Sequence, residues 1–212
     1  MARKTKAEAL ETREQLLDAA ERVFRARGVG NATLEEVATA AGMTRGAVYH
    51  HFDSKAALFE ALVRRAEMPM GAAFGEPGVV VGDPLAAVRD QAVLALRHLA
   101  DSARVRNIFE IVSLRCEYSK ELAPVARRRK KEANQCLAQC GGLLDQAVAR
   151  GQLPKGTDTA LAARALHSYI GGLMRDWVQA PRSFDLHAAA PGLIGLFLAG
   201  LRACPPRVSG IA

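Results

Sequence analysis

The sequence of 212 residues has little of what marks an exported, membrane-spanning or metal-binding protein. Its four cysteines form no Cys-x-x-Cys pair, so a zinc-ribbon or dithiol motif is excluded and reduced thiols are expected. The first residues are basic and polar and lack the apolar segment of a signal peptide, so the sequence predicts a cytoplasmic protein. No apolar run reaches the roughly 18 residues of a membrane span, and no membrane partner is expected.

Acidic side chains are in the minority, which suits a nucleic-acid partner. The chain has 29 Lys and Arg against 22 Asp and Glu, a net charge of +7. Residues 1–65 contain 11 basic and 9 acidic side chains, so charge alone does not locate a DNA site. The basic arm of Arg3, Lys4 and Lys6 is either a phosphate or minor-groove contact or a solvated tail.

The stretch 33–52 has the pattern of two short helices joined by a tight turn. Thr33 with Glu36 three residues later forms a capping box, and Thr44 can cap the second helix. Gly42 stands where a helix end needs positive φ. The apolar positions recur at helical spacing on one face of each helix: Leu34, Val37, Ala38 and Ala41, then Val48 and Phe52. The pattern predicts a helix-turn-helix.

The side chains left over on the second helix are suited to a DNA major groove. Arg45 can reach guanine edges or phosphate, Tyr49 a thymine methyl group, and Lys55 a phosphate. Arg45, Tyr49, His50 and Lys55 are expected to face outward. The predicted DNA-binding residues are Thr33, Thr44, Arg45, Gly46, Tyr49, His50, His51 and Lys55. A helical hairpin of an all-α enzyme or adaptor is the alternative, but such hairpins rarely expose these donors.

These segments resemble the TetR family of transcriptional repressors. Residues 16–24, 33–42 and the run TRGAVYHHFDSKAALFEAL are similar to its N-terminal domain, with Tyr49, His51, Phe52 and Lys55 in the family's Tyr-x-His-Phe-x-x-Lys pattern. The opening ARKTKAEALETREQLLDAAERVF, residues 107–122 and residues 169–186 resemble the AcrR-like branch, repressors of multidrug efflux pumps. The resemblance implies a repressor of an efflux operon that a hydrophobic effector releases. His50 replaces the large aromatic residue often found there, which bears on operator preference.

The whole chain is expected to be all-α. A helix beginning near Leu16 ends at Gly28, and further helices are expected at about 55–67, from 84, at 104–116, 119–150, 158–179 and 186–202, with a loop at 68–83. Residues 1–54 are predicted to be a three-helix helix-turn-helix DNA-binding domain, too small to be stable alone. Residues 55–212 are predicted to be a helical effector-binding and dimerisation domain, in which helix 55–67 is the mechanical link.

The last two predicted helices are apolar on more than one face. Small residues that allow close helix approach recur in the final helix: Ala190, Gly192, Gly195 and Ala199. Such helices either are central in a bundle or pack on a partner. Because a near-palindromic operator is read by a two-fold symmetric protein, we expect a homodimer through these two helices. An ordinary buried core pair is the alternative.

A ligand cavity is expected between the body helices, chiefly because the resemblance implies one. The candidate lining residues are Met70, Gln91, Phe109, Ser113, Cys136, Cys140, His167, Ile170 and Met174. Plain core is the alternative for each of them. Met and Cys side chains are polarizable and suit a cavity that accepts several ligand shapes.

Two rival functions rest on other residues. Cys136, Cys140 and His167 could serve a thiol- or metal-dependent sensor or enzyme, but no motif positions the histidine and one helical turn is poor disulfide geometry. The run 127–131 is either a solvated face or a second nucleic-acid patch of a nonspecific architectural protein. We therefore expect no enzyme activity, no metal site and no cofactor.

Overall fold

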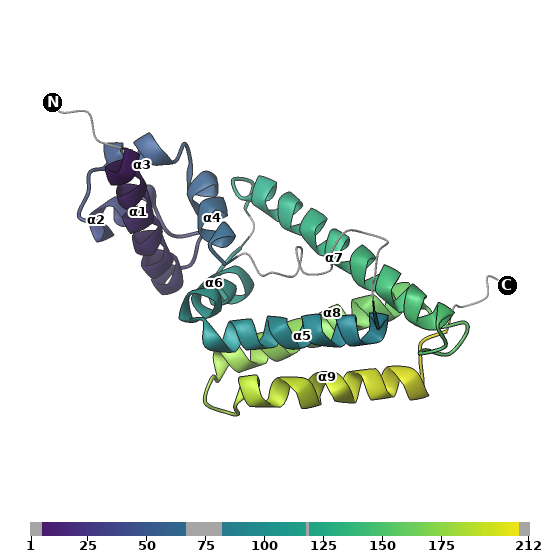
Figure 1. The fold of residues 1–212 in the computed structure, drawn as a ribbon. Helices are drawn as coiled ribbons and strands as arrows, with labels where there is room; N and C mark the ends of the chain where they lie inside the picture. The colour runs from purple at the N-terminus through teal and green to yellow at the C-terminus, as the bar shows by residue number, and fades with distance from the viewer. Residues whose placement is uncertain (1–5, 67–81, 118, 208–212) are drawn as a thin grey trace. The chain divides into compact units, whose positions relative to one another are not determined.

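The computed structural model describes residues 6–66, 82–117 and 119–207, and this part of the chain is all-α apart from one isolated bridge between Thr157 and Arg207 (Figure 1). The basic arm at Arg3 and Lys4, the predicted loop up to residue 81 and the candidate Met70 lie outside it. Its helices are α1 (Lys6–Arg27), α2 (Leu34–Ala40), α3 (Arg45–His51), α4 (Lys55–Arg64), α5 (Pro84–Asp101), α6 (Ala103–Leu114), α7 (Ala123–Ala149), α8 (Thr159–Gln179) and α9 (Leu186–Ala203). The predicted all-α fold class is confirmed.

Packing divides the chain into two compact units. The first contains α1 to α4, residues from 104 onward in α6, and α7 up to Arg128; the second contains α5, α7 from Arg129, α8 and α9. The predicted boundary between residues 54 and 55 separates functions and stays a prediction. By packing, α4 and α6 both belong with the three N-terminal helices.

The helix ends follow the local sequence signals closely. Asp83 accepts hydrogen bonds from the amides of Leu85 and Ala86, both at 2.9 Å, and Pro84 is the first residue of α5. α7 begins four residues later than expected, at Ala123. A helix beginning at residue 119 would hold Pro124 in its interior, where proline removes a hydrogen bond and clashes with the preceding turn; in the first turn it is tolerated.

The core of the first unit extends well beyond the helix-turn-helix. The rings of Phe24 on α1 and Phe59 on α4 meet edge to face with centroids 5.9 Å apart, and both are fully buried. α6 adds Ile108 and Ile111, and Leu122 ahead of α7 and Val125 within α7 belong to the same cluster. α1 with the two seven-residue helices α2 and α3 buries too little apolar surface to be stable alone. The expectation that they depend on the following segments is confirmed.

In the second unit α9 runs alongside α5, and α8 contacts both (Figure 1). Pro191 lies inside α9 and lacks the N–H that would bind the carbonyl of His187. Arg97 of α5 supplies the missing donor, with its Nε 3.3 Å from that carbonyl oxygen. One side chain thereby satisfies a backbone acceptor and attaches α5 to α9.

Only one stripe of α9 is covered. Leu186, Ala190, Ile194, Leu198 and Leu201 are buried, whereas Leu196 is 69% exposed. By length and composition alone, α9 could cross a membrane. Its 18 residues have a mean hydropathy of 1.4, and 28% of them are buried. The expectation that no apolar segment reaches this length is therefore wrong. Five glycine and alanine residues after residue 191 interrupt the large apolar side chains, so the sequence shows no long run of them.

Gly28 ends α1 at a φ of +79°, and a Cβ there would lie 3.2 Å from the carbonyl oxygen of Arg115. Gly28→Ala is expected to lower the free energy of unfolding by about 1–2 kcal/mol, because alanine is strained at positive φ. Gly30→Ala is the matched control, since nothing lies within 4 Å of its Cβ position. Chemical denaturation measures both; equal stabilities for the two variants would contradict the prediction.

Candidate DNA-binding surface and effector cavity

The turn before α2 is fixed by the predicted capping box. Thr33 Oγ1 accepts from the amide of Glu36 at 3.2 Å, and the Thr33 amide donates to Glu36 Oε2 at 2.9 Å. The backbone hydrogen bond from Thr33 is the main cause of the lowered pKa of Glu36. At the start of α3, Thr44 Oγ1 accepts from the amide of Ala47 at 3.3 Å. Both predicted caps are confirmed, and Gly42 between the helices has a φ of +67°.

α3 is anchored on one face and open on the other. Val48 and Phe52 are buried, whereas Arg45, Gly46, Tyr49 and His50 are exposed. Arg45 Nη2 donates to the hydroxyl of Tyr49 at 3.3 Å, and its guanidinium carbon lies 5.4 Å from the ring centroid. Arg45, Tyr49 and His50 face outward as expected. Their contact with DNA stays a prediction.

Lys55 does not face outward, contrary to expectation. Its ammonium group donates to the carbonyls of Gly30 at 3.1 Å and Ala32 at 3.2 Å, and lies 3.4 Å from a carboxylate oxygen of Glu121. Its side chain is only 13% exposed. Backbone acceptors in a turn need donors, and this lysine supplies them at the turn before α2. A phosphate contact by Lys55 stays a prediction.

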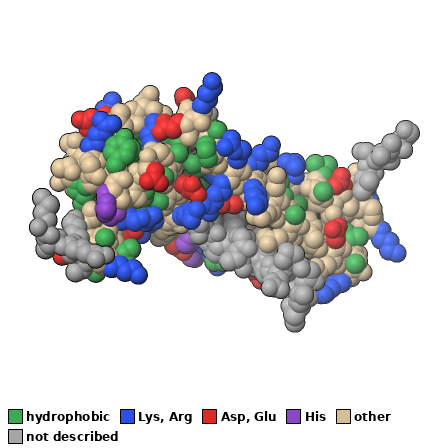
Figure 2. Space-filling model, turned by 90° about the horizontal axis from the view of Figure 1, so that it is seen from above, with side chains coloured by type: hydrophobic (Ala, Val, Ile, Leu, Met, Phe, Trp, Pro, Cys, Tyr) green, Lys and Arg blue, Asp and Glu red, His purple; other side chains and the backbone are tan. Residues whose placement is uncertain are grey.

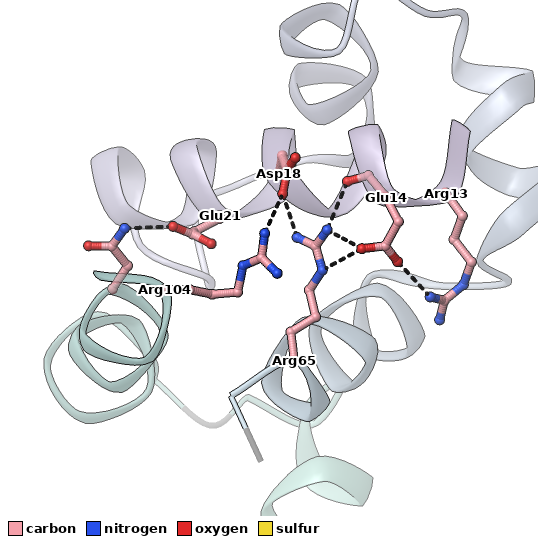
Figure 3. Close-up of polar contacts among 7 residues, drawn as sticks. Arg13, Glu14, Asp18, Glu21, Arg65 and Arg104 are labelled. Carbon is pink, nitrogen blue, oxygen red and sulfur yellow. Dashed lines mark hydrogen bonds and ion pairs between the residues drawn. The ribbon is translucent and has the colours of Figure 1, made fainter. Parts of the chain in front are cut away.

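A row of acidic side chains on α1 holds the end of α4 (Figure 3). Arg65, whose side chain is 9% exposed, donates to Asp18 Oδ1 at 2.6 Å and through Nε to Glu14 Oε2 at 3.0 Å. It also donates to the backbone carbonyl of Glu14 at 3.2 Å. Arg104 reaches the same Asp18 at 4.0 Å. One guanidinium thus attaches α4 to two successive turns of α1.

The same row continues along α6. Asn107 donates to Glu21 Oε1 at 2.7 Å, and Arg25 pairs with Glu110 at 3.0 Å. The amide of Val29 then donates to the carbonyl of Arg115 at 2.9 Å. Contacts therefore join α6 to the second half of α1, from Asp18 to Arg25, and to the turn that follows it. Sequence reasoning missed this row, although the spacing of Glu14, Asp18 and Glu21 by four and three residues places them on one helix face.

The basic run 127–131 is partly used inside the protein. Arg128 and Arg64 both pair with Glu60 of α4, and hydrogen bonds from Arg64 and then Arg128 lower the pKa of that carboxyl group. Lys and Arg side chains recur with acidic ones between them over the face drawn in Figure 2. Arg128 serves internal packing, which weakens the reading of this run as a second nucleic-acid patch.

A cavity inside the second unit brings together five of the nine predicted lining residues: Gln91, Cys136, Cys140, His167 and Ile170. The rest of its lining is Val88, Ala92, Leu137, Ala163 and Leu166. Phe109 and Ser113 belong to α6 in the first unit and are not part of this lining, and Met174 is buried but is not part of it either. Binding of a ligand by these residues stays a prediction.

The cavity is small and weakly polar. Its free space is about 20 Å³, which is the room of about one water molecule. Drug-sized ligands occupy pockets of about 300 Å³ or more. Side chains of α5, α7 and α8 therefore have to move before such a molecule enters.

The thiols in this cavity are poor nucleophiles. Burial raises the pKa of Cys136, and burial followed by the nearby Cys136 raises the pKa of Cys140 to about 12. Desolvation, then the charge of Arg164, lowers the pKa of His167. Thiolates are the reactive and metal-binding form of cysteine, and among the described residues no group of three or more His, Cys, Asp or Glu is placed to hold a metal. The thiol- or metal-dependent alternative therefore finds no geometric support here.

Two family models match the chain. Residues 16–62 match the bacterial regulatory proteins of the tetR family, and residues 83–202 match the C-terminal region of MAATS-type transcriptional repressors. The repressor BepR of Brucella suis is 39% identical over 207 residues, covering 95% of this chain and 97% of BepR. The chain belongs to the TetR family. The resemblance to its AcrR-like branch is confirmed.

Solved structures of TetR-family repressors agree with this fold. NalD, the secondary repressor of the MexAB-OprM multidrug efflux pump of Pseudomonas aeruginosa, is 34% identical with a TM-score of 0.83, covering 92% of this chain and 98% of NalD. A complex of SmeT, an efflux-pump repressor of Stenotrophomonas maltophilia, with triclosan is 31% identical with a TM-score of 0.75, covering 90% of this chain and 91% of SmeT. The helix-turn-helix at α2 and α3 lies within residues 16–62, which match the tetR family model.

Arg65→Met is expected to lower the free energy of unfolding by about 1–2 kcal/mol, because it removes several charge-assisted hydrogen bonds from a nearly buried guanidinium. The adjacent Arg64→Met is the control. Arg64 is 57% exposed and makes one pair along its own helix with Glu60, so a change within about 0.5 kcal/mol is expected. Denaturation curves of both variants measure the free energy of unfolding. An equal loss of stability in both would contradict the prediction that the contacts of Arg65 with α1 stabilise the fold more than the Arg64–Glu60 pair does.

Proposed function

We propose that this TetR-family regulator is a homodimeric repressor that binds a near-palindromic operator and is released by a hydrophobic small molecule. The observation that carries the proposal is the exposed Arg45–Tyr49 pair on α3, held by the buried Val48 and Phe52. The repressors BepR and NalD, to which the chain is similar, support repression as the direction of regulation. We infer a cytoplasmic location and no catalytic activity.

The DNA contact is proposed to be made by α3 in the major groove. The Arg45 hydrogen bond to Tyr49 limits both side chains before DNA arrives, which reduces the entropy lost on binding. Arg45 then offers paired donors to a guanine edge or phosphate, and the Tyr49 ring can contact a thymine methyl group. Three more exposed residues lie at or within this helix, namely Thr44, Gly46 and His50. They are proposed to add contacts with the DNA backbone.

The dimer is proposed to form through α8 and α9. Leu161 of α8 is 49% exposed and Leu196 of α9 is 69% exposed, and Gly192, Gly195 and Ala199 share the open side of α9. An apolar helix face of this kind is costly in water and typical of subunit interfaces. Packing against a second copy accounts for a helix that is apolar enough for a membrane yet lies in a DNA-binding regulator.

Release is proposed to begin at the cavity between α5, α7 and α8. The SmeT–triclosan complex shows that a relative binds a small apolar molecule. An effector acts only if it binds the DNA-incompetent state more tightly than the competent one. α5 supplies cavity residues and is joined through Ser102 to α6, which is attached to α1. This connection adds to the proposed mechanical role of α4.

The regulated genes are proposed to encode a multidrug efflux pump, as for NalD and SmeT. Sequencing the genomic DNA fragments that the purified protein retains tests this directly. Recovery of a near-palindromic site beside efflux-pump genes is expected. Recovery of fragments without a common site would refute sequence-specific repression.

Arg45→Ala and Tyr49→Ala should each weaken operator binding about tenfold or more, since each removes a base or phosphate contact. Arg182→Ala changes an arginine that is also exposed, in the turn after α8, and should leave operator affinity unchanged. Fluorescence anisotropy with the recovered operator measures all three. Full affinity in both α3 variants would mean that this helix does not read DNA.

Leu196→Glu is expected to convert the dimer to monomers, because it places a charge in the proposed apolar interface. Leu94→Glu is the control: Leu94 is 45% exposed but belongs to α5. Sedimentation velocity at micromolar concentration gives the subunit number of each variant. A dimeric Leu196→Glu variant, or a monomeric wild type, would rule out this interface.

A further inference from the structure

The cavity between α5, α7 and α8 lacks the groups with which proteins bind organic cations. Its ten lining residues include no Asp or Glu and no Phe, Tyr or Trp. Burying a cation costs several kcal/mol unless a carboxylate or an aromatic ring face compensates it. The polar side chains of the lining are Gln91, His167 and the thiols of Cys136 and Cys140.

Charges beside the cavity disfavour a cation as well. Arg164 lies one helical turn before His167 on α8, near enough to help lower the histidine's pKa. The lowered pKa keeps the imidazole neutral at pH 7, able both to donate and to accept a hydrogen bond. Two acidic side chains on the helices that form the cavity have partners elsewhere: Asp90 of α5 pairs with Arg89 at 2.8 Å, and Asp145 of α7 accepts from Thr159 Oγ1 at 2.6 Å.

We propose that the effector of this repressor is an uncharged, largely apolar molecule with a hydroxyl-type group that Gln91 and His167 recognise, and that permanent organic cations are excluded from the cavity. This inference rests on the proposed function, because it specifies the effector of that repressor. Val88, Leu137, Leu166 and Ile170 supply the apolar contact area. Gln91 on α5 and His167 on α8 supply hydrogen bonds from two different walls.

The small volume strengthens the selection against charge. With about 20 Å³ of free space, a ligand has to displace apolar side chains to enter, and the apolar lining removes water from the part of the ligand that it covers. A hydroxyl group can exchange its water hydrogen bonds for those of Gln91 and of His167, which is exposed at the edge of the lining. A quaternary ammonium group has no such exchange and would lie against Cys136, Cys140 and aliphatic groups.

Three probes of nearly the same size test this on the purified full chain: tert-butylbenzene, 4-tert-butylphenol and phenyltrimethylammonium. The first and third differ essentially by one carbon replaced with a charged nitrogen. We expect the phenol to bind about tenfold more tightly than the hydrocarbon, and the cation about 100-fold more weakly than the hydrocarbon or not at all. Calorimetry gives the affinities, and anisotropy with labelled operator shows release.

Variants assign the effect to the named residues. Gln91→Leu and His167→Leu should reduce the phenol-to-hydrocarbon affinity ratio toward one, while hydrocarbon binding persists as proof of folding. Cys136→Asp adds a carboxylate to the lining and should raise affinity for phenyltrimethylammonium at least about tenfold. Cys204→Asp is its matched control, because Cys204 is exposed at the end of α9 and outside the cavity.

The outcomes separate this inference from the function on which it rests. Cation binding as tight as hydrocarbon binding, in competition with the phenol, overturns it, and so does an unchanged phenol preference in both Leu variants. Absence of binding by all three probes at their solubility limits also overturns it. In each of these cases operator binding by the unliganded protein leaves the repressor proposal standing. Loss of operator binding itself is the separate result that would end that proposal.

Discussion

The burial of Phe24 against Phe59, in one cluster with Ile108 and Ile111 of α6, is the constraint on which the candidate DNA-binding surface depends. α2 and α3 are each seven residues long and are too short to be stable in isolation. They hold their positions because Val37 and Val48 are buried in this shared core. The orientation of Arg45 and Tyr49 is therefore determined by apolar contacts that neither side chain makes.

Polar contacts then fix the direction in which these packed helices can move. Apolar contacts tolerate sliding, whereas the hydrogen bonds of Arg65 to Glu14 and Asp18 and of Asn107 to Glu21 require one register. α1 is the common partner of α4 and α6. A displacement of either helix would have to carry α1 with it or break charge-assisted hydrogen bonds. This arrangement suits a domain that must present one helix in a reproducible position.

Much of the fold could be predicted from local sequence rules for helix caps and turns. The capping box at Thr33 and Glu36, the positive φ of Gly42 and the cap at Asp83 follow from residue chemistry within one turn, and the structure confirms them. Helical spacing correctly predicted that Val48 is buried and that Tyr49 is exposed. Errors arose where distant segments decide the outcome. Lys55 was expected in solvent, but the carbonyls of Gly30 and Ala32, more than twenty residues earlier, bind its ammonium group.

For the candidate cavity too, local sequence spacing could be used for some residues, whereas distant segments decide the placement of others. Cys136 with Cys140, and His167 with Ile170, are near neighbours on their helices, so sequence spacing could group each pair. Phe109 and Ser113 have the right character but belong to the other unit, and no spacing rule assigns a helix to one unit or the other. Arg65 was missed because its partners lie about fifty residues away along the chain.

The placement of the cavity wholly within the second unit has an evolutionary consequence. None of its lining residues takes part in the polar row on α1 or in the caps of α2 and α3. Under the proposed function, a substitution such as Ala163 to a larger residue would change which molecules fit the cavity without altering the residues proposed to read the operator. Descendants of such a regulator would then acquire new effectors one amino acid at a time and keep their operator.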